Sequence, residues 1–187
     1  MKTAFNIVGK GETIIFIHGI GSRESSWNGV IEKLKDKYQC ISYDLRGHGN
    51  SSIDESNFTL IDLVEDLEKL RLNLNINKIH LVGHSLGGMI APSYAKKYQS
   101  RVLSLSLLST AAFRSAKEQK KLLDIINKIE KEGLEKILPN LINRWFTDKF
   151  IITNKKIIDK RFRQVLDTPL KTFLNVFRLY ALTEMSS

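Results

Sequence analysis

One serine, set in a glycine-rich turn between an apolar run and a helical stretch, constrains the fold of this chain more than any other feature. The turn reads Gly83-His84-Ser85-Leu86-Gly87-Gly88. The apolar run, Ile79 to Val82, predicts a buried strand, and Met89 to Tyr98 predicts a helix. Small residues on both sides of a serine allow a tight turn and a close approach of strand and helix. The pattern therefore predicts a strand, a turn and a helix that present Ser85 in a strained conformation.

Ser85 is the best candidate in the sequence for a nucleophile, with a simple glycine-rich turn before a helix as the alternative. A serine hydroxyl attacks a carbonyl only when a base takes its proton. In strand-turn-helix sites of this kind, the acid and the histidine follow the serine in the chain. The histidines of this chain all precede Ser85: His18, His48, His80 and His84. The sequence therefore predicts a nucleophile and offers no candidate for its base.

The part of the chain before residue 112 alternates short apolar strands with amphipathic helices, which predicts a mostly parallel sheet covered on both faces. The expected strands are Thr13 to Ile17, Gln39 to Tyr43, Lys78 to Val82 and Val102 to Leu108, with Thr3 to Val8 as an antiparallel edge strand. The expected helices are Trp27 to Asp36 and Asn57 to Leu72, the second with Thr59 as its N-cap and Asp62 three residues on. Because Val102 to Leu108 alternates apolar residues with serine, we expect it to meet a polar or crowded second face.

After Ala112 the strand signals stop, and helical periodicity continues to Thr183. The expected helices are Lys117 to Lys131, Leu134 to Phe146, Asn154 to Leu166 and Leu170 to Leu182, separated near Gly133, near residues 147–153 and at Thr168-Pro169. Helices that follow the strands of an α/β sheet are most simply a cap over its carboxyl edge, where ligands bind. We therefore expect a core domain of residues 1–112 and a helical cap of residues 113–187 above Ser85.

Two further motifs follow predicted strands. The first reads His18-Gly19-Ile20-Gly21 and the second reads Tyr43-Asp44-Leu45-Arg46-Gly47-His48-Gly49. In the first, the backbone N–H of Ile20 would face the same point as the N–H of Leu86, and two such donors stabilise an oxyanion. A structural glycine turn is the alternative. In the second motif we expect Asp44 and Arg46 to form a structural pair, and in both motifs we expect the histidine to be structural.

Composition and charge exclude several classes of protein. With 187 residues, 42% of them apolar and 26% charged, the chain has the size and composition of one globular domain. The formal charge is +9, but most of the excess lies after residue 110, where lysines alternate with acidic residues as on a solvated helix face. They form no stripe with interleaved aromatic residues, so we expect no nucleic-acid partner. An anion-binding surface, which would suit a carboxylate-bearing substrate, stays as the alternative.

No window of the sequence has the apolar length needed to span a bilayer, and the N-terminus has no long apolar run. We therefore expect a cytoplasmic protein with no membrane partner. The single cysteine, Cys40, excludes a disulfide framework, and its apolar surroundings predict a buried side chain with no functional role. Nothing in the sequence fixes the oligomeric state.

The three motifs, in this order and spacing, resemble those of the α/β-hydrolase fold family. Within that family the chain is most similar to the small carboxylic-ester and lactone hydrolases typified by 3-oxoadipate enol-lactonase. The resemblance implies a serine hydrolase that forms an acyl-enzyme on Ser85, with Ile20 and Leu86 as backbone oxyanion donors. It also implies a small-molecule ester or lactone as substrate and neither a metal nor a cofactor.

The chain also departs from the family pattern. The last two strands of the family, whose loops carry the acid and then the histidine, have no counterpart here, so no residue inherits those roles. The aspartates after Ser85 are better explained as surface charges: Asp124, Asp148, Asp159 and Asp167. We expect a C-terminally truncated chain that is close to inactive alone, with an exposed apolar edge on its last strand. The alternative is a catalytically dead protein of the same fold that binds a small molecule or a partner.

Overall fold

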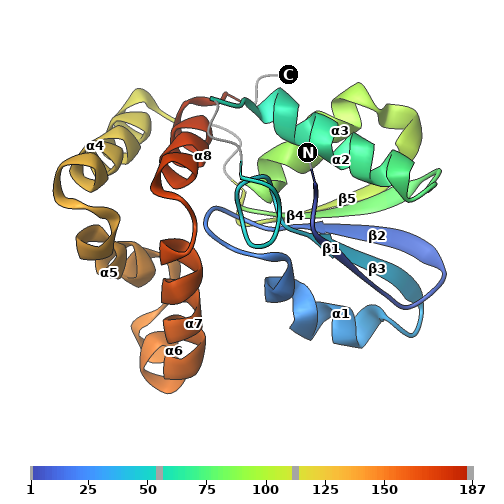
Figure 1. Cartoon of the computed structure of the whole chain (residues 1–187), viewed down its shortest axis with the longest axis horizontal. Coiled ribbons are helices and arrows are strands. Elements are labelled where there is room, and N and C mark those ends of the chain that lie inside the picture. Colours follow the sequence, from blue (N-terminus) through green and yellow to red (C-terminus); the bar gives the residue numbers. More distant parts are fainter. Residues whose placement is uncertain (1, 54–56, 111–113, 185–187) are drawn as a thin grey trace.

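A five-stranded mixed sheet forms the centre of the computed structural model, which describes residues 2–53, 57–110 and 114–184 (Figure 1). Its strands are β1 (Phe5–Val8), β2 (Glu12–Ile17), β3 (Tyr38–Tyr43), β4 (Ile79–His84) and β5 (Val102–Leu108), in the spatial order β1-β3-β2-β4-β5. β1 pairs with β3 in an antiparallel arrangement, and all other pairs are parallel. The predicted mostly parallel sheet with an antiparallel edge strand is therefore confirmed.

Helices cover both faces of this sheet (Figure 1). α1 (Asn28–Leu34), preceded by a short 3₁₀ turn (Glu24–Trp27), lies on one face, and α2 (Leu60–Asn73) and α3 (Gly87–Lys97) lie on the other. A second 3₁₀ turn, Gln99–Arg101, leads into β5. Because β2 lies between two layers of helices, its apolar residues alternate between them. Ile14 and Phe16 pack with Trp27 and Ile31 in a small cluster. The alternate residues of β2, Ile15 and Ile17, belong to the larger core cluster with α2 and α3.

The start of α2 shows how a local sequence signal fixes a helix end. The Thr59 side chain accepts a hydrogen bond from the Asp62 N–H, and the Asp62 carboxylate accepts one from the Thr59 N–H at 2.7 Å. This reciprocal capping box satisfies two N–H groups that have no partner within the helix. The predicted N-cap is confirmed, and the helix begins at Leu60 rather than at Asn57 because the cap residue itself is not helical.

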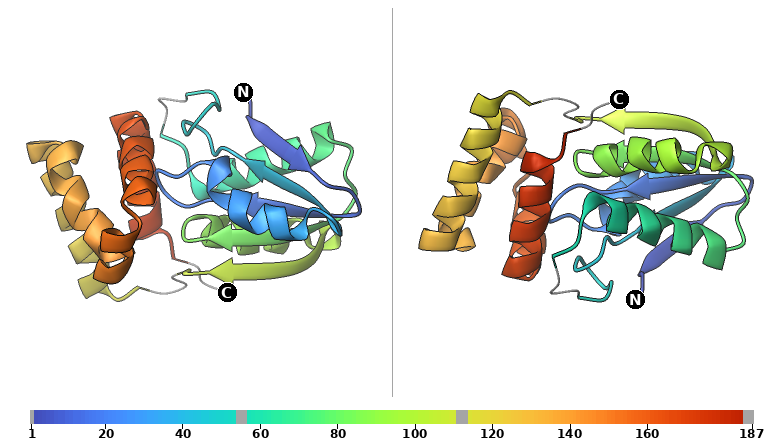
Figure 2. Two further views of the ribbon diagram at one scale, coloured as in Figure 1. Left: turned by 90° about the horizontal axis from the view of Figure 1, so that it is seen from below. Right: turned by 90° about the horizontal axis from the view of Figure 1, so that it is seen from above.

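Five helices follow β5 in the described part of the chain, and we call them the cap helices: α4 (Ala116–Glu132), α5 (Leu134–Trp145), α6 (Asp148–Thr153), α7 (Lys155–Leu166) and α8 (Leu170–Leu182). They lie beyond the carboxyl ends of the parallel strands, as two opposite views show (Figure 2). The predicted break at residues 147–153 was wrong, because Thr147 caps a short helix there by accepting from the Phe150 N–H. The predicted boundary between residues 112 and 113 lies outside the described residues, so the division into two domains stays a prediction.

β5 lies at one edge of the sheet and is exposed along most of its length. Leu103, Leu105, Leu107 and Leu108 are each between 39% and 47% exposed. The expectation of a polar or crowded second face was wrong, since side chains from both faces of β5 are exposed among the described residues. The expected apolar edge is confirmed.

Candidate active site

Ser85 lies in the turn that joins β4 to α3, at the carboxyl edge of the sheet. Its φ is 54°, in the left-handed region that few residues other than glycine adopt. The Ser85 N–H donates to the Leu108 carbonyl at 3.0 Å, which ties the turn to the end of β5. A strained conformation fixed by its neighbours is typical of functional sites. The predicted strand, tight turn and helix around Ser85 are thus present.

The glycines on either side of Ser85 are required by close packing. A Cβ on Gly83 would lie 2.2 Å from the Gly87 carbonyl oxygen, and a Cβ on Gly87 would lie 2.2 Å from the Ile17 carbonyl oxygen. A Cβ on Gly88 would lie 1.7 Å from the Thr110 hydroxyl oxygen. No side chain fits at these distances, so β4 and α3 approach closely only because these residues are glycine.

The loop of residues 18–22, which we call the oxyanion loop after the role expected of it from the sequence, lies against this turn. A Cβ on Gly19 would lie 3.1 Å from the Ser85 Cβ. Among the described residues, neither the Ile20 N–H nor the Leu86 N–H donates a hydrogen bond, although both residues are at least nine-tenths buried. Buried backbone N–H groups nearly always have partners, so two free donors beside a strained serine are suited to bind an anion.

Two buried histidines support this loop and the neighbouring loop of residues 44–50. The Nε2 atom of His18 accepts from the Leu45 N–H at 3.0 Å, and that of His48 accepts from the Gly21 N–H at 3.1 Å. The Nδ1 atom of each ring lies near a backbone carbonyl, at 2.8 and 3.1 Å, so the hydrogen-bond network assigns the proton to Nδ1. Burial lowers the pKa of His18 to about 4 and that of His48 to about 3. Both rings are therefore neutral at pH 7, and each links two backbone segments.

The predicted pairing of Asp44 with Arg46 was wrong. The Arg46 guanidinium instead forms a bidentate ion pair with Asp66 on α2, at 2.6 and 2.8 Å. The Asp44 carboxylate accepts from the backbone N–H groups of Glu24 and Asn50, at 2.8 and 2.9 Å. Each side chain therefore fixes a different part of the same loop: Arg46 ties it to a helix, and Asp44 closes its turns.

No base for Ser85 is found in the described part of the chain. No imidazole or carboxylate there forms a hydrogen bond with the Ser85 hydroxyl, His84 is exposed, and His80 lies beside Ser104 on the sheet. The four aspartates predicted to be surface charges are all exposed, and one of them, Asp167, forms an ion pair with Arg23 at 2.8 Å. The structure thus brings together a serine and two donors without a group that removes the proton.

Arg161 is a neighbour of the site that the sequence did not indicate. It comes from α7, and its guanidinium donates to the Ile20 carbonyl at 2.6 Å and to the Gly21 carbonyl. The guanidinium also lies 4.8 Å from the centre of the Trp145 ring. Burial lowers its pKa to about 10, which still leaves it charged at neutral pH. About 140 residues separate the arginine from its partners in the chain, so no local pattern indicates this contact.

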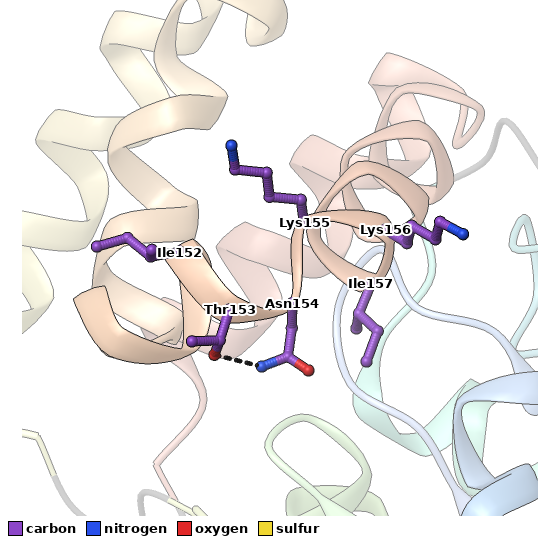
Figure 3. A pocket seen from close by; sticks show the side chains of 6 residues that line it. All are labelled: Ile152, Thr153, Asn154, Lys155, Lys156 and Ile157. Carbon is purple, nitrogen blue, oxygen red and sulfur yellow. Dashed lines mark hydrogen bonds between the residues drawn. The ribbon is translucent and has the colours of Figure 1, made fainter.

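Other features of the described residues do not add to the site. Cys40 is fully buried, as predicted. A hollow of about 440 Å³ lies where α6 meets α7 and is lined by residues 152–157 (Figure 3). Those side chains include two lysines and two isoleucines but no nucleophile, acid or imidazole positioned as at Ser85, so the hollow has no catalytic chemistry. In the ranges described, no group of three His, Cys, Asp or Glu side chains is placed to hold a metal, and no helix is long and apolar enough to cross a membrane.

A largely parallel sheet with a strained serine after its fourth strand, and with helices beyond its carboxyl edge, defines a known class of α/β protein. The family model of the alpha/beta hydrolase fold matches residues 12–176. The chain therefore belongs to the α/β-hydrolase fold family.

Known proteins extend this assignment. The chain is 30% identical over 175 residues to 3-oxoadipate enol-lactonase 1 of Acinetobacter baylyi, covering 90% of this chain and 62% of that protein. It resembles the structure of a thermophilic esterase from Thermogutta terrifontis, with 27% identity, a TM-score of 0.87, and coverage of 97% of this chain and 68% of the esterase. An enol-lactonase from Burkholderia xenovorans shares the fold at 20% identity and a TM-score of 0.90, with 98% and 71% covered. The chain thus spans about two thirds of the length of these relatives.

Proposed function

We propose that this chain carries the nucleophile and the oxyanion hole of a serine hydrolase that acts on a small carboxylic ester or lactone. The single observation that carries the proposal is Ser85, held at positive φ beside two backbone N–H groups without partners. The esterase and lactonase relatives support the substrate class, because they are similar over nearly the whole of this chain. We keep the proposed division into core and cap, with the cap helices above the site.

The proposed reaction follows from the positions of these groups. The Ser85 hydroxyl attacks the carbonyl carbon, and the N–H groups of Ile20 and Leu86 bind the oxyanion that forms. Collapse of the tetrahedral intermediate expels the alcohol or opens the lactone, and water then hydrolyses the acyl-enzyme. His18, Gly19, Gly21, Gly83, His84, Gly87 and Gly88 shape the turn and the loop. Since none of the described groups takes the Ser85 proton, we assign neither the base nor the acid to a residue.

The experiment that tests this proposal measures hydrolysis of p-nitrophenyl acetate by the 187-residue chain and by its Ser85→Ala variant. Without a base, we expect the chain to be inactive beyond the roughly 10³ to 10⁴-fold acceleration over water that binding and an oxyanion hole supply. A fluorophosphonate ester should label Ser85 slowly, and the alanine variant should not be labelled. Hydrolysis at ordinary enzymatic rates that Ser85→Ala abolishes would show that a group within the chain acts as the base, contrary to this expectation.

A second candidate function is binding without hydrolysis, as in a catalytically dead protein that holds a small molecule or a partner. The specific observation in its favour is the same pair of N–H donors, which have no partner among the described residues and lie next to a serine for which those residues supply no base. A ligand that binds only the folded chain stabilises it by RT ln(1 + L/Kd) at a free ligand concentration L, so its melting temperature rises with ligand concentration. A shift of the Ser85→Ala variant with an ester or lactone, without turnover by the unsubstituted chain, would favour this candidate.

A further inference from the structure

Hydrogen bonds hold the oxyanion loop from two sides, the core and the cap helices. On the core side, the His48 ring accepts from the Gly21 N–H at 3.1 Å, and within the loop the Ser22 N–H donates to the Gly19 carbonyl at 3.2 Å. On the cap side, Arg161 donates to the carbonyls of Ile20 and Gly21. The two consecutive carbonyls therefore point toward the cap, and the Ile20 N–H is left for a ligand.

We propose that Arg161 is a positioning residue that orients the oxyanion loop, so that the cap helices set the geometry of the oxyanion hole. The inference rests on the proposed function, because it assigns Arg161 to the Ile20 donor of that site. Peptide planes are rigid, and the carbonyls of Ile20 and Gly21 belong to the two planes that flank the Gly21 Cα. Fixing both carbonyls therefore limits rotation of the backbone next to the Ile20 N–H. A donor that is aimed before the reaction costs no reorganisation when the oxyanion forms.

The chemistry of arginine suits this role. A guanidinium is a planar fork of N–H donors that reaches two carbonyls at once, whereas a lysine ammonium is a point charge on a flexible stem. The Trp145 ring, 4.8 Å from the guanidinium carbon, supports the fork from the same layer of helices. A second tie between cap and loop, the ion pair of Arg23 with Asp167, is solvent-exposed on the aspartate side and is expected to contribute little.

A different role for Arg161, the binding of a carboxylate on the substrate, fits the contacts less well. Both terminal nitrogens already donate to the loop carbonyls, so the fork faces the loop, and a ligand carboxylate would have to use the N–H groups that remain. The two roles make different predictions for an uncharged probe. Loss of a positioning residue slows the reaction of any probe at Ser85, whereas loss of a carboxylate-binding residue affects only probes that carry a carboxylate.

The first test measures amide hydrogen exchange by NMR in the 187-residue chain and in the Arg161→Met and Arg161→Lys variants. The matched control is Arg163→Met, because Arg163 is exposed on the same helix and bonds only to a carbonyl of that helix. We expect exchange at Gly21 and Ser22 to become about tenfold faster in Arg161→Met, with a smaller change in Arg161→Lys and none in the control. Unchanged exchange at Gly21 in Arg161→Met would overturn the proposal.

The amide of Leu81, in the centre of β4, reports whether a variant has lost stability as a whole. If Arg161→Met also speeds exchange at Leu81, the comparison is made with Arg161→Lys, which keeps the charge and most of the stem. Faster exchange at Gly21 with an unchanged Leu81 amide then supports positioning. Equal changes at both amides would show that Arg161 only stabilises the fold.

The second test compares rates at which an uncharged fluorophosphonate ester labels Ser85, followed by intact mass. We expect Arg161→Met to slow labelling by on the order of tenfold to a hundredfold, and Arg163→Met to leave the rate unchanged. Equal rates for Arg161→Met and the unsubstituted chain would overturn the positioning role. If the unsubstituted chain is not labelled, the proposed nucleophile fails instead, and the exchange at Gly21 still decides whether Arg161 orients the loop.

Discussion

At the scale of single residues, the glycines around Ser85 give the sharpest prediction of stability. Gly87→Ala places a Cβ 2.2 Å from the Ile17 carbonyl oxygen, a backbone atom that moves only with β2. We expect this variant to lower the free energy of unfolding by about 1–3 kcal/mol or more. Gly29→Ala is the matched control, because a Cβ there meets nothing within 4 Å in a helix, and it should be stabilising by about 0.5–1 kcal/mol. Urea unfolding measures both, and equal effects of the two substitutions would refute the close approach of α3 to β2.

Single residues also differ in whether their roles and contacts can be predicted from the sequence. Ser85 and its glycines were predicted because a tight turn dictates small residues at neighbouring positions, which is a local rule. The partners of Arg46 and Arg161 were not predicted, since a long charged side chain carries no local sign of what it meets. Asp66 follows Arg46 by 20 residues and Arg161 follows Gly21 by 140, so only the folded chain brings these groups together.

At the scale of elements, two paired leucines in β4 and β5 test how the cost of a substitution depends on the exposure of the side chain. Leu81 in β4 is fully buried and is paired with Leu105 in β5, which is 39% exposed. Leu81→Ala should cost about 2–5 kcal/mol of unfolding free energy, and Leu105→Ala well under half of that, because less apolar surface is lost from the interior. Denaturant unfolding of the two variants checks this order. A cost at Leu105 as large as that at Leu81 would mean that another surface covers β5 in solution.

The exposed leucines of β5 also predict association. An unpaired apolar edge strand is a template for pairing with another chain, and a charge on it opposes that pairing. We expect Leu105→Lys to reduce light scattering of the concentrated protein, whereas Lys33→Gln on α1, far from this edge, should not.

Elements themselves were predictable where periodicity was strong, as in α2 and α4. α6 was missed because a helix of six residues has too few turns to show a period.

At the scale of the whole molecule, the order of strands and helices in sequence was enough to predict the class of fold, because alternation of the two permits few topologies. The way the cap helices meet the core was not predictable. A Cβ on Gly21 would lie 3.1 Å from the Val165 side chain and 3.2 Å from that of Phe173, contacts between segments about 140 residues apart. Such docking depends on shape that forms only after both parts fold.

The two buried histidines link these loops to the stability of the entire chain. Burial lowers the pKa of His18 to about 4 and that of His48 to about 3, from an ordinary value of 6.5. Below pH 6.5 the unfolded chain binds protons at these positions and the folded chain does not, so the free energy of unfolding falls as the pH falls toward 4. For each ring, the unfolding free energy falls by up to roughly 1.4 kcal/mol per unit of difference between its pKa in the unfolded and in the folded chain.

Chemical denaturation between pH 7 and pH 4.5 measures this dependence, and the slope above about pH 5.5 is the part to which carboxylates contribute least. A His48→Gln variant keeps an acceptor for the Gly21 N–H and removes a titrating ring, so its stability at pH 7 should fall while its slope between pH 6.5 and 4.5 becomes shallower. Asn73→Gln, at an exposed position of α2 that carries no titrating ring, serves as the control and should keep the full slope. A flat profile for the unsubstituted chain would contradict the burial of neutral rings, because only a difference in proton binding between the folded and unfolded chains produces a slope.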